Sequence, residues 1–98
     1  MSCPSNSSGL RSADAAILAR PGRLLGVIGI ADGTNQATVT VYDNASAASG
    51  TVLAQVIVDA TLTYQDMHLP GEGVICNSGI YVDVTGTGAN YIIYYTLS

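Results

Sequence analysis

Short runs of alternating apolar and polar residues limit the fold of this chain more than any other feature. Residues 37–43 read Ala-Thr-Val-Thr-Val-Tyr-Asp, and residues 51–58 alternate in the same way. A period of two places every second side chain on one face of an extended strand. The predicted inward faces are Ala37, Val39 and Val41 in the first run and Val52, Ala54, Val56 and Val58 in the second. The small residues at 44–50 suit a hairpin loop between the two strands.

The rest of the chain repeats these signals. Further strands are predicted at 23–31, 61–64, 73–76, 80–84 and 91–97, with Ile80, Val82 and Val84 pointing inward. Turn residues lie between them at 32–35, 70–71 and 86–90. The run 23–31 is apolar on both faces, so this strand is either covered on each side or turned toward a neighbouring subunit.

Residues 12–20 fit either a helix or a strand. Ser12 could cap a short helix rich in Ala and Leu. Ala15, Ile17 and Ala19 also alternate with their neighbours, and consistency with the other segments favours a strand. With this strand the sequence predicts an all-β fold, a single antiparallel β-sandwich or jelly-roll-like barrel of about seven or eight short strands.

Composition narrows the classes of partner. The chain has 98 residues, enough for one domain, and a formal net charge of -4 with only 10% charged residues. It has no Lys, and its three Arg residues all lie in the first quarter of the sequence. Nucleic-acid phosphates need clustered Lys and Arg, so a nucleic-acid partner is not expected. A surface with so few charges is weakly protected against association.

The first 13 residues are rich in Ser, and we expect them to form a flexible N-terminal arm before a sandwich domain at 14–98. They lack the features of a secretory signal, and Gly, Thr, Asp or Asn interrupts every apolar run, so we expect neither export nor a membrane partner. In a cytosol, Cys3 and Cys76 are expected to be free thiols.

Several residues are candidates for catalysis or ligand binding, but each of them also fits a structural role. His68 follows Asp66 by two residues, as neighbours on one strand face do, and no nucleophile accompanies it. The segment 86–88, Gly-Thr-Gly, is expected to be a turn because no phosphate-loop helix follows it. The acidic residues are spread singly, as turn caps are: Asp32, Asp43, Asp59, Asp66 and Asp83. We therefore expect no enzymatic activity, no cofactor and no metal.

The last predicted strand is rich in tyrosine. Tyr91 and Tyr95 face one way and Tyr94 the other, so at least one phenol should reach the surface. Tyrosines at such positions serve as core packing, as anchors of a protein interface, or as platforms that stack on sugars or bases.

Several segments together resemble a known family. They are YDNASAASGT at 42–51, PGEG at 70–73, SGIYVDV at 78–84 and the Tyr-rich last strand. Over residues 14–97 the chain resembles the small β-sandwich virion proteins of tailed bacteriophages, which include capsid decoration or cement proteins and minor head and tail proteins. The resemblance implies a structural role in the virion and supplies no catalytic residues.

On this resemblance we expect a capsid decoration or cement protein that binds and stabilises the head. Its partners would be the major capsid protein or another virion protein, and copies of itself. The expected binding elements are residues 2–11 and the exposed side of 91–97, with Leu10, Arg11, Tyr91, Tyr94 and Tyr95 as interface residues. One alternative is a neck, tail or fibre component, and another is a carbohydrate-binding module that stacks sugars on Tyr64, Tyr81 or Tyr94.

Overall fold

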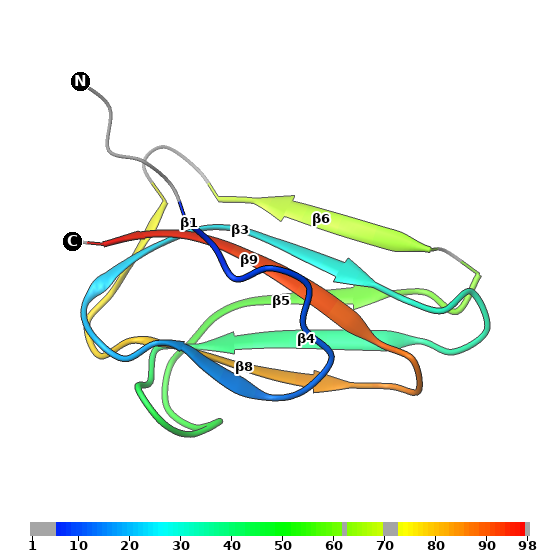
Figure 1. Ribbon diagram of the computed structural model, residues 1–98, viewed down its shortest axis with the longest axis horizontal. Coiled ribbons are helices and arrows are strands. Elements are labelled where there is room, and N and C mark those ends of the chain that lie inside the picture. The colour runs from blue at the N-terminus through cyan, green and yellow to red at the C-terminus, as the bar shows by residue number, and fades with distance from the viewer. Residues whose placement is uncertain (1–5, 62, 70–72, 98) are drawn as a thin grey trace.

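The computed structural model describes residues 6–61, 63–69 and 73–97, and all regular structure in this part is β-strand. Two antiparallel sheets pack face to face, which confirms the predicted β-sandwich (Figure 1). The strands are β1 (Asn6–Ser7), β2 (Ala15–Leu18), β3 (Gly22–Ile30), β4 (Ala37–Tyr42), β5 (Val52–Val58), β6 (Tyr64–His68), β7 (Val74–Cys76), β8 (Ile80–Thr85) and β9 (Asn90–Leu97).

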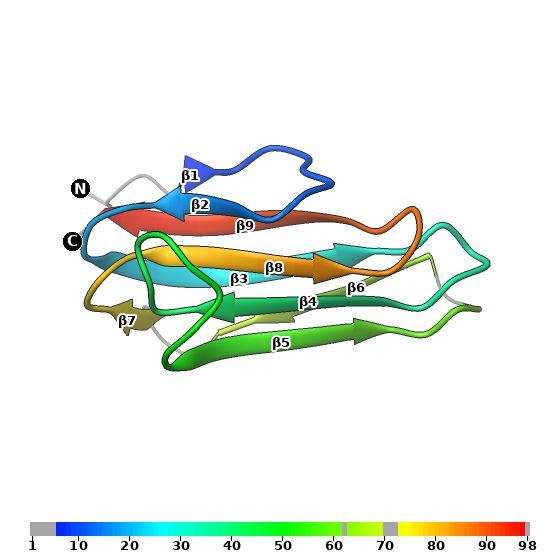
Figure 2. The ribbon, with the colours of Figure 1, turned by 90° about the horizontal axis from the view of Figure 1, so that it is seen from below.

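The strands form one sheet of five and one of four. In the five-stranded sheet, called sheet A, the order is β1-β9-β3-β6, and β7 also pairs with β3. Sheet B has the order β2-β8-β4-β5. The long pair β3–β9 runs from Gly22 opposite Leu97 to Ile30 opposite Asn90 and forms the centre of sheet A. In Figure 2, β8, β4 and β5 of sheet B lie in front of β9, β3 and β6.

One apolar core fills the space between the sheets. Ala37, Val39 and Val41 of β4 are fully buried, as are Ile80 and Val82 of β8, which confirms the inward faces predicted for these strands. Sheet A contributes Leu24, Val27, Tyr91 and Ile93 to the same core.

One side chain of β5 departs from the predicted pattern. Val52 is 51% exposed, although it was expected to share the face of Ala54. The register shifts here, because Val41 pairs with Ala54 while the next residue, Tyr42, pairs with Val52. The bulge leaves Leu53 as an extra residue and turns Val52 outward.

The N-terminal segment also differs from its prediction. Residues 6–13 were expected in a flexible arm, but they lie along β9. The Ser8 amide donates to the Ile93 carbonyl at 2.8 Å, and Arg11 and Tyr91 exchange two backbone hydrogen bonds of 2.9 and 2.8 Å. The strand alternative for 12–20 is confirmed by β2, which pairs with β8. Segment 6–18 thus adds an edge strand to each sheet, while the rest of the predicted arm lies outside the described residues.

The strand predicted at 61–64 is wrong, since β6 begins at Tyr64. Before it, an Asp59 carboxylate oxygen accepts hydrogen bonds from the Thr61 amide at 3.1 Å and the Thr61 hydroxyl at 3.2 Å. This Asx turn includes Thr61, the first residue that β propensity assigned to a strand. β6 then pairs with residues 26–30 of β3. The turn predicted at 70–71 lies outside the described residues.

Three of the five predicted aspartates, Asp32, Asp43 and Asp59, cap turns, whereas Asp66 and Asp83 lie within strands. Asp32 accepts hydrogen bonds from the amides of Thr34 (2.8 Å) and Asn35 (2.7 Å) in the turn at 32–35. Asp43 reaches a distant turn, where its carboxylate accepts from the amides of Ser78 at 2.8 Å and Asn77 at 3.1 Å. Asp43 therefore ties the end of β4 to the connection between β7 and β8.

Replacing Asp43 by Ala should lower the free energy of unfolding by about 1–2 kcal/mol at neutral pH, because these amides lose their charged acceptor. Burial raises the pKa of Asp43, but the hydrogen bonds from Ser78, Asn77 and Gly79 outweigh it and hold the pKa below its usual 3.8. The contribution of the carboxylate is therefore present above the unfolded-state pKa and is lost as the pH falls through the folded-state pKa.

Urea denaturation of wild type and Asp43→Ala from neutral to strongly acidic pH measures this difference. The difference in the free energy of unfolding between the two proteins should become smaller below about pH 4. Asp43→Asn, which keeps an acceptor oxygen without the charge, should lose less than the alanine variant. A gap that stays constant into strong acid would contradict the role given to the carboxylate.

Candidate protein interface

The outer face of sheet A carries a row of apolar side chains. Residues opposite each other in antiparallel strands lie on the same face of the sheet. The neighbours of Ile28 and Ile30 along β3 point into the core, so Ile28 and Ile30 point outward. Ile28 pairs with Ile92 of β9 and with Asp66 of β6, Ile30 pairs with Tyr64, and Tyr94 pairs with a glycine of β3. The five apolar residues Ile28, Ile30, Ile92, Tyr94 and Tyr64 are called the outer A face, and Asp66 is the charged residue beside them.

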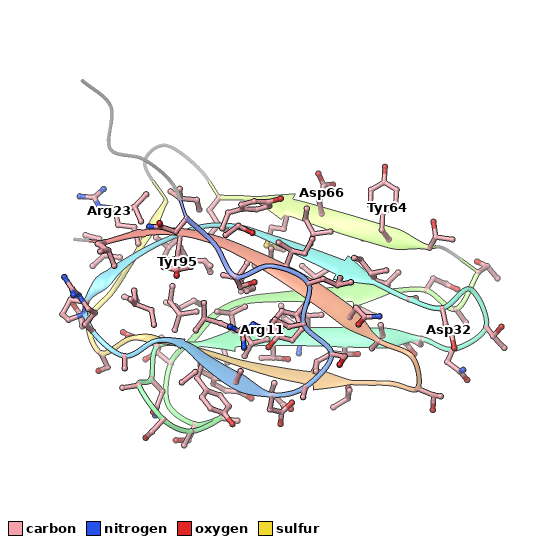
Figure 3. All side chains as sticks on the ribbon, in the orientation of Figure 1. Arg11, Arg23, Asp32, Tyr64, Asp66 and Tyr95 are labelled. Carbon is pink, nitrogen blue, oxygen red and sulfur yellow. The ribbon has the colours of Figure 1, made fainter. Side chains whose placement is uncertain are left out.

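This face is accessible. Tyr64 is 62% exposed and Tyr94 37%, and the three isoleucines are half-buried. Figure 3 shows Tyr64 and Asp66 pointing away from the sandwich on the same side of β6. Contiguous apolar side chains on a solvent-facing sheet are typical of surfaces that contact another molecule.

The outer face of sheet B is more polar. Its central strands present Thr38, Thr40, Asp83 and Thr85 in register with one another. The Gln55 amide nitrogen of β5 donates a hydrogen bond of 3.0 Å to the Thr40 hydroxyl. The hydrogen bond between Gln55 and Thr40 occupies part of this face, and Tyr42 and Tyr81 lie opposite each other further along the same strands.

The five predicted interface residues differ in location and exposure in the structure. Tyr94 lies on the outer A face, opposite in direction to Tyr91 and Tyr95, as the alternation predicted. Leu10 is 65% exposed and Arg11 is also exposed, both in the segment beside β9. Tyr95 is half-buried and packs against the core. Whether Leu10, Arg11, Tyr94 and Tyr95 contact a partner stays a prediction.

Tyr91 has an internal role instead. Its side chain is fully buried, and its hydroxyl donates a hydrogen bond of 2.7 Å to the Ala13 carbonyl. Burial raises the pKa of the Tyr91 phenol, and the positive charge of Arg11 only partly opposes it. Tyr91 therefore joins the N-terminal segment to the core and is not available on the surface of the folded chain.

The three tyrosines proposed to stack on sugars lie on two different sheets. Tyr64 and Tyr94 share the outer A face, but Tyr81 points outward from β8 on the other sheet, opposite Tyr42. A single stacking surface can use at most the first two.

Sequence reasoning did not single out Ile28, Ile30 and Ile92. A signal was present, because the run 23–31 is apolar on both faces and one reading of it was a strand turned toward a neighbouring subunit. The missing information was that β9 and β6 flank β3, which places Ile92 and Tyr64 beside its outward side chains.

Most of the remaining candidates for chemistry lie within the described residues, 6–61, 63–69 and 73–97. No group of three or more His, Cys, Asp or Glu side chains there is placed to hold a metal ion. The described part also has no buried side-chain nitrogen or oxygen without a hydrogen-bond partner.

Cys76 is a buried free thiol, and burial raises its pKa, which disfavours the reactive thiolate. The 86–88 segment lies in a turn, with the Ala89 amide donating to the Gly86 carbonyl at 3.3 Å.

Asp83 and Asp14 form a pair of acids at the edge of sheet B. Burial, the negative charge of Asp14 and a hydrogen bond with Asp14 all raise the pKa of Asp83. Asp14 also accepts a hydrogen bond of 2.9 Å from the Val84 amide. Because the folded state raises the pKa of Asp83, this carboxyl contributes stability below its unfolded-state pKa and loses that contribution as the pH rises through its folded-state pKa.

The fold and its surface thus define a small antiparallel β-sandwich with an apolar outer face on sheet A. No helix that could cross a membrane occurs in the ranges that the structure describes. Comparison of the chain with protein-family models and with curated proteins found no match.

Proposed function

We propose that this protein is a non-enzymatic structural component of a bacteriophage virion, a capsid decoration or cement protein that binds the head through the outer A face. The observation that carries the binding role is the accessible row Ile28, Ile30, Ile92, Tyr94 and Tyr64 on three adjacent strands of one sheet. The virion context comes from the sequence resemblance described above.

The physical properties of this face support adhesion. Aromatic side chains with few rotatable bonds lose little conformational entropy when they are buried, and they are enriched where protein interfaces gain most of their binding energy. A β-sheet holds Tyr64 and Tyr94 in fixed positions before binding, which reduces the ordering cost. Many weak copies of such a contact on a symmetric shell would gain avidity.

Virion particles provide the test. Purified particles from cells that carry the gene should contain the protein in many copies per head, as measured by quantitative mass spectrometry. The Tyr64→Ala/Tyr94→Ala double variant should be incorporated about tenfold less or worse, because truncating aromatic anchors at an interface commonly costs 2 kcal/mol or more. Tyr81→Ala, on the outer face of sheet B, is the matched control and should be incorporated normally.

The other outcomes distinguish the alternatives. A few copies per particle would favour a neck, tail or fibre component, and absence from particles would reject the virion role. A glycan-array signal that disappears in the Tyr64→Ala/Tyr94→Ala variant would favour a carbohydrate-binding module. Normal incorporation of that variant would show that another surface makes the contact.

A further inference from the structure

We infer that β5 is a docking edge for the β5 strand of a second copy, so that two sheets B join into one antiparallel sheet across a twofold axis. This inference does not depend on the proposed function, since the outer A face stays uncovered in such a dimer. Within the described residues β5 pairs with β4 only, and Figure 2 shows it as the outermost strand of its sheet.

Edge strands normally carry features that prevent pairing with another chain. Such features are short length, charged residues, prolines and bulges. β1 has only two residues and β7 three, β2 has four residues and a register irregularity, and β6 carries Asp66 at its centre. Each of these other edges therefore has at least one protective feature.

β5 lacks this protection over most of its length. It has seven residues, Val-Leu-Ala-Gln-Val-Ile-Val, with no charged residue, proline or glycine. Its bulge affects only the beginning of the strand, and the pairing with β4 is regular from Ala54 to Val58. Ile57 is 49% exposed on the outer face beside this edge. The regular stretch 54–58 therefore has none of these protective features along the edge where its backbone donors and acceptors face away from β4.

The side chains of this stretch favour an identical partner. Antiparallel pairing with full overlap of 54–58 centres the twofold axis on Val56. Val56 then lies opposite its copy and Ala54 lies opposite Val58, which extends the apolar inner face from one molecule to the next. On the outer face Gln55 lies opposite Ile57. No like charges face each other in this stretch. The twofold contact uses the β5 edge of each copy, so no third copy can add to either β5 edge.

Sedimentation velocity at increasing protein concentration tests the dimer. Wild type should change from monomer to dimer, and Ile57→Lys should weaken the dimer about tenfold or more, because it places charges beside the axis in both copies. Thr85→Lys adds the same charge on the outer face of the same sheet, away from β5, and should associate as wild type does. A monomer at all concentrations, or equal weakening in both variants, would overturn the proposal.

Cross-linking tests the register. In a Cys3→Ser background, Gln55→Cys and Ile57→Cys proteins are mixed and oxidised with diamide, which takes two electrons and two protons from each thiol pair. The mixture should form interchain disulfides several times faster than either variant alone. In the proposed register residue 55 of one copy lies opposite residue 57 of the other copy, and neither residue lies opposite its own counterpart. Faster cross-linking of one variant with itself would reject the proposed register.

Discussion

Tyr91→Ala is expected to lower the free energy of unfolding by about 3–5 kcal/mol, the usual cost of removing a buried aromatic ring. Tyr91 is fully buried between the sheets, and its hydroxyl holds the Ala13 carbonyl at 2.7 Å. The substitution leaves a cavity in the core and releases the N-terminal segment. For a domain of this size the melting temperature should fall by more than roughly 12 °C, as calorimetry would measure.

Two matched variants separate the parts of this effect. Tyr91→Phe keeps the ring and loses only the hydrogen bond, so it should cost about 1 kcal/mol, because the exposed Ala13 carbonyl can bind water instead. Tyr94→Ala removes the same side chain from the outer A face and should also cost much less than Tyr91→Ala. Equal losses for Tyr91→Ala and Tyr94→Ala would contradict the core position of Tyr91.

Gly29→Val is expected to destabilise the sandwich by about 1–3 kcal/mol through overpacking. Gly29 of β3 faces sheet B across the core. A Cβ atom added there would lie 2.9 Å from Val58 Cγ2, 3.3 Å from Val56 Cγ1 and 3.4 Å from Val39 Cγ2. Valine adds two further methyl groups to this gap, so the sheets must separate or the facing valines must change rotamer. Thermal and urea unfolding would measure the loss.

A double-mutant cycle identifies the cause. Gly29→Ala brings one methyl group into the gap, and Val58→Ala removes two from the facing side. If contact with Val58 is responsible, the double variant should lose less than the sum of the single losses, by about 1 kcal/mol. Strictly additive losses would indicate that Gly29 is required for another reason.

Sequence patterns were sufficient where a strand buries one face and exposes the other. The alternation at 37–43 and 80–84 predicted both the strands and their buried faces, since in a two-layer sandwich apolar side chains must meet between the sheets. It also predicted that Tyr94 points away from Tyr91 and Tyr95. It could not determine which of these two directions is inside, because a strand of tyrosines and isoleucines is apolar on both sides.

The missed features depend on contacts between distant residues. Asn6–Ser7 has the composition of a disordered segment, but its backbone pairs with β9, and composition does not reveal backbone pairing. Tyr64–His68 includes Gln, Asp and His, which are not strong strand formers, and becomes a strand because β3 pairs with it. The outer A face depends on the same long-range pairing, so the sequence offered 23–31, Tyr64 and the exposed side of 91–97 as separate candidates without placing them side by side.

The pairing of the first strand with the last affects how the chain can fold during synthesis. Asn6 pairs with Tyr95, and the central strand β3 pairs with β9 along nearly its whole length. Sheet A and the N-terminal edge therefore cannot be completed until β9 has been translated, and contacts of such long range slow folding. Before that point one side of β3 has no partner strand, so we expect premature termination before β9 to yield insoluble fragments rather than a smaller folded domain.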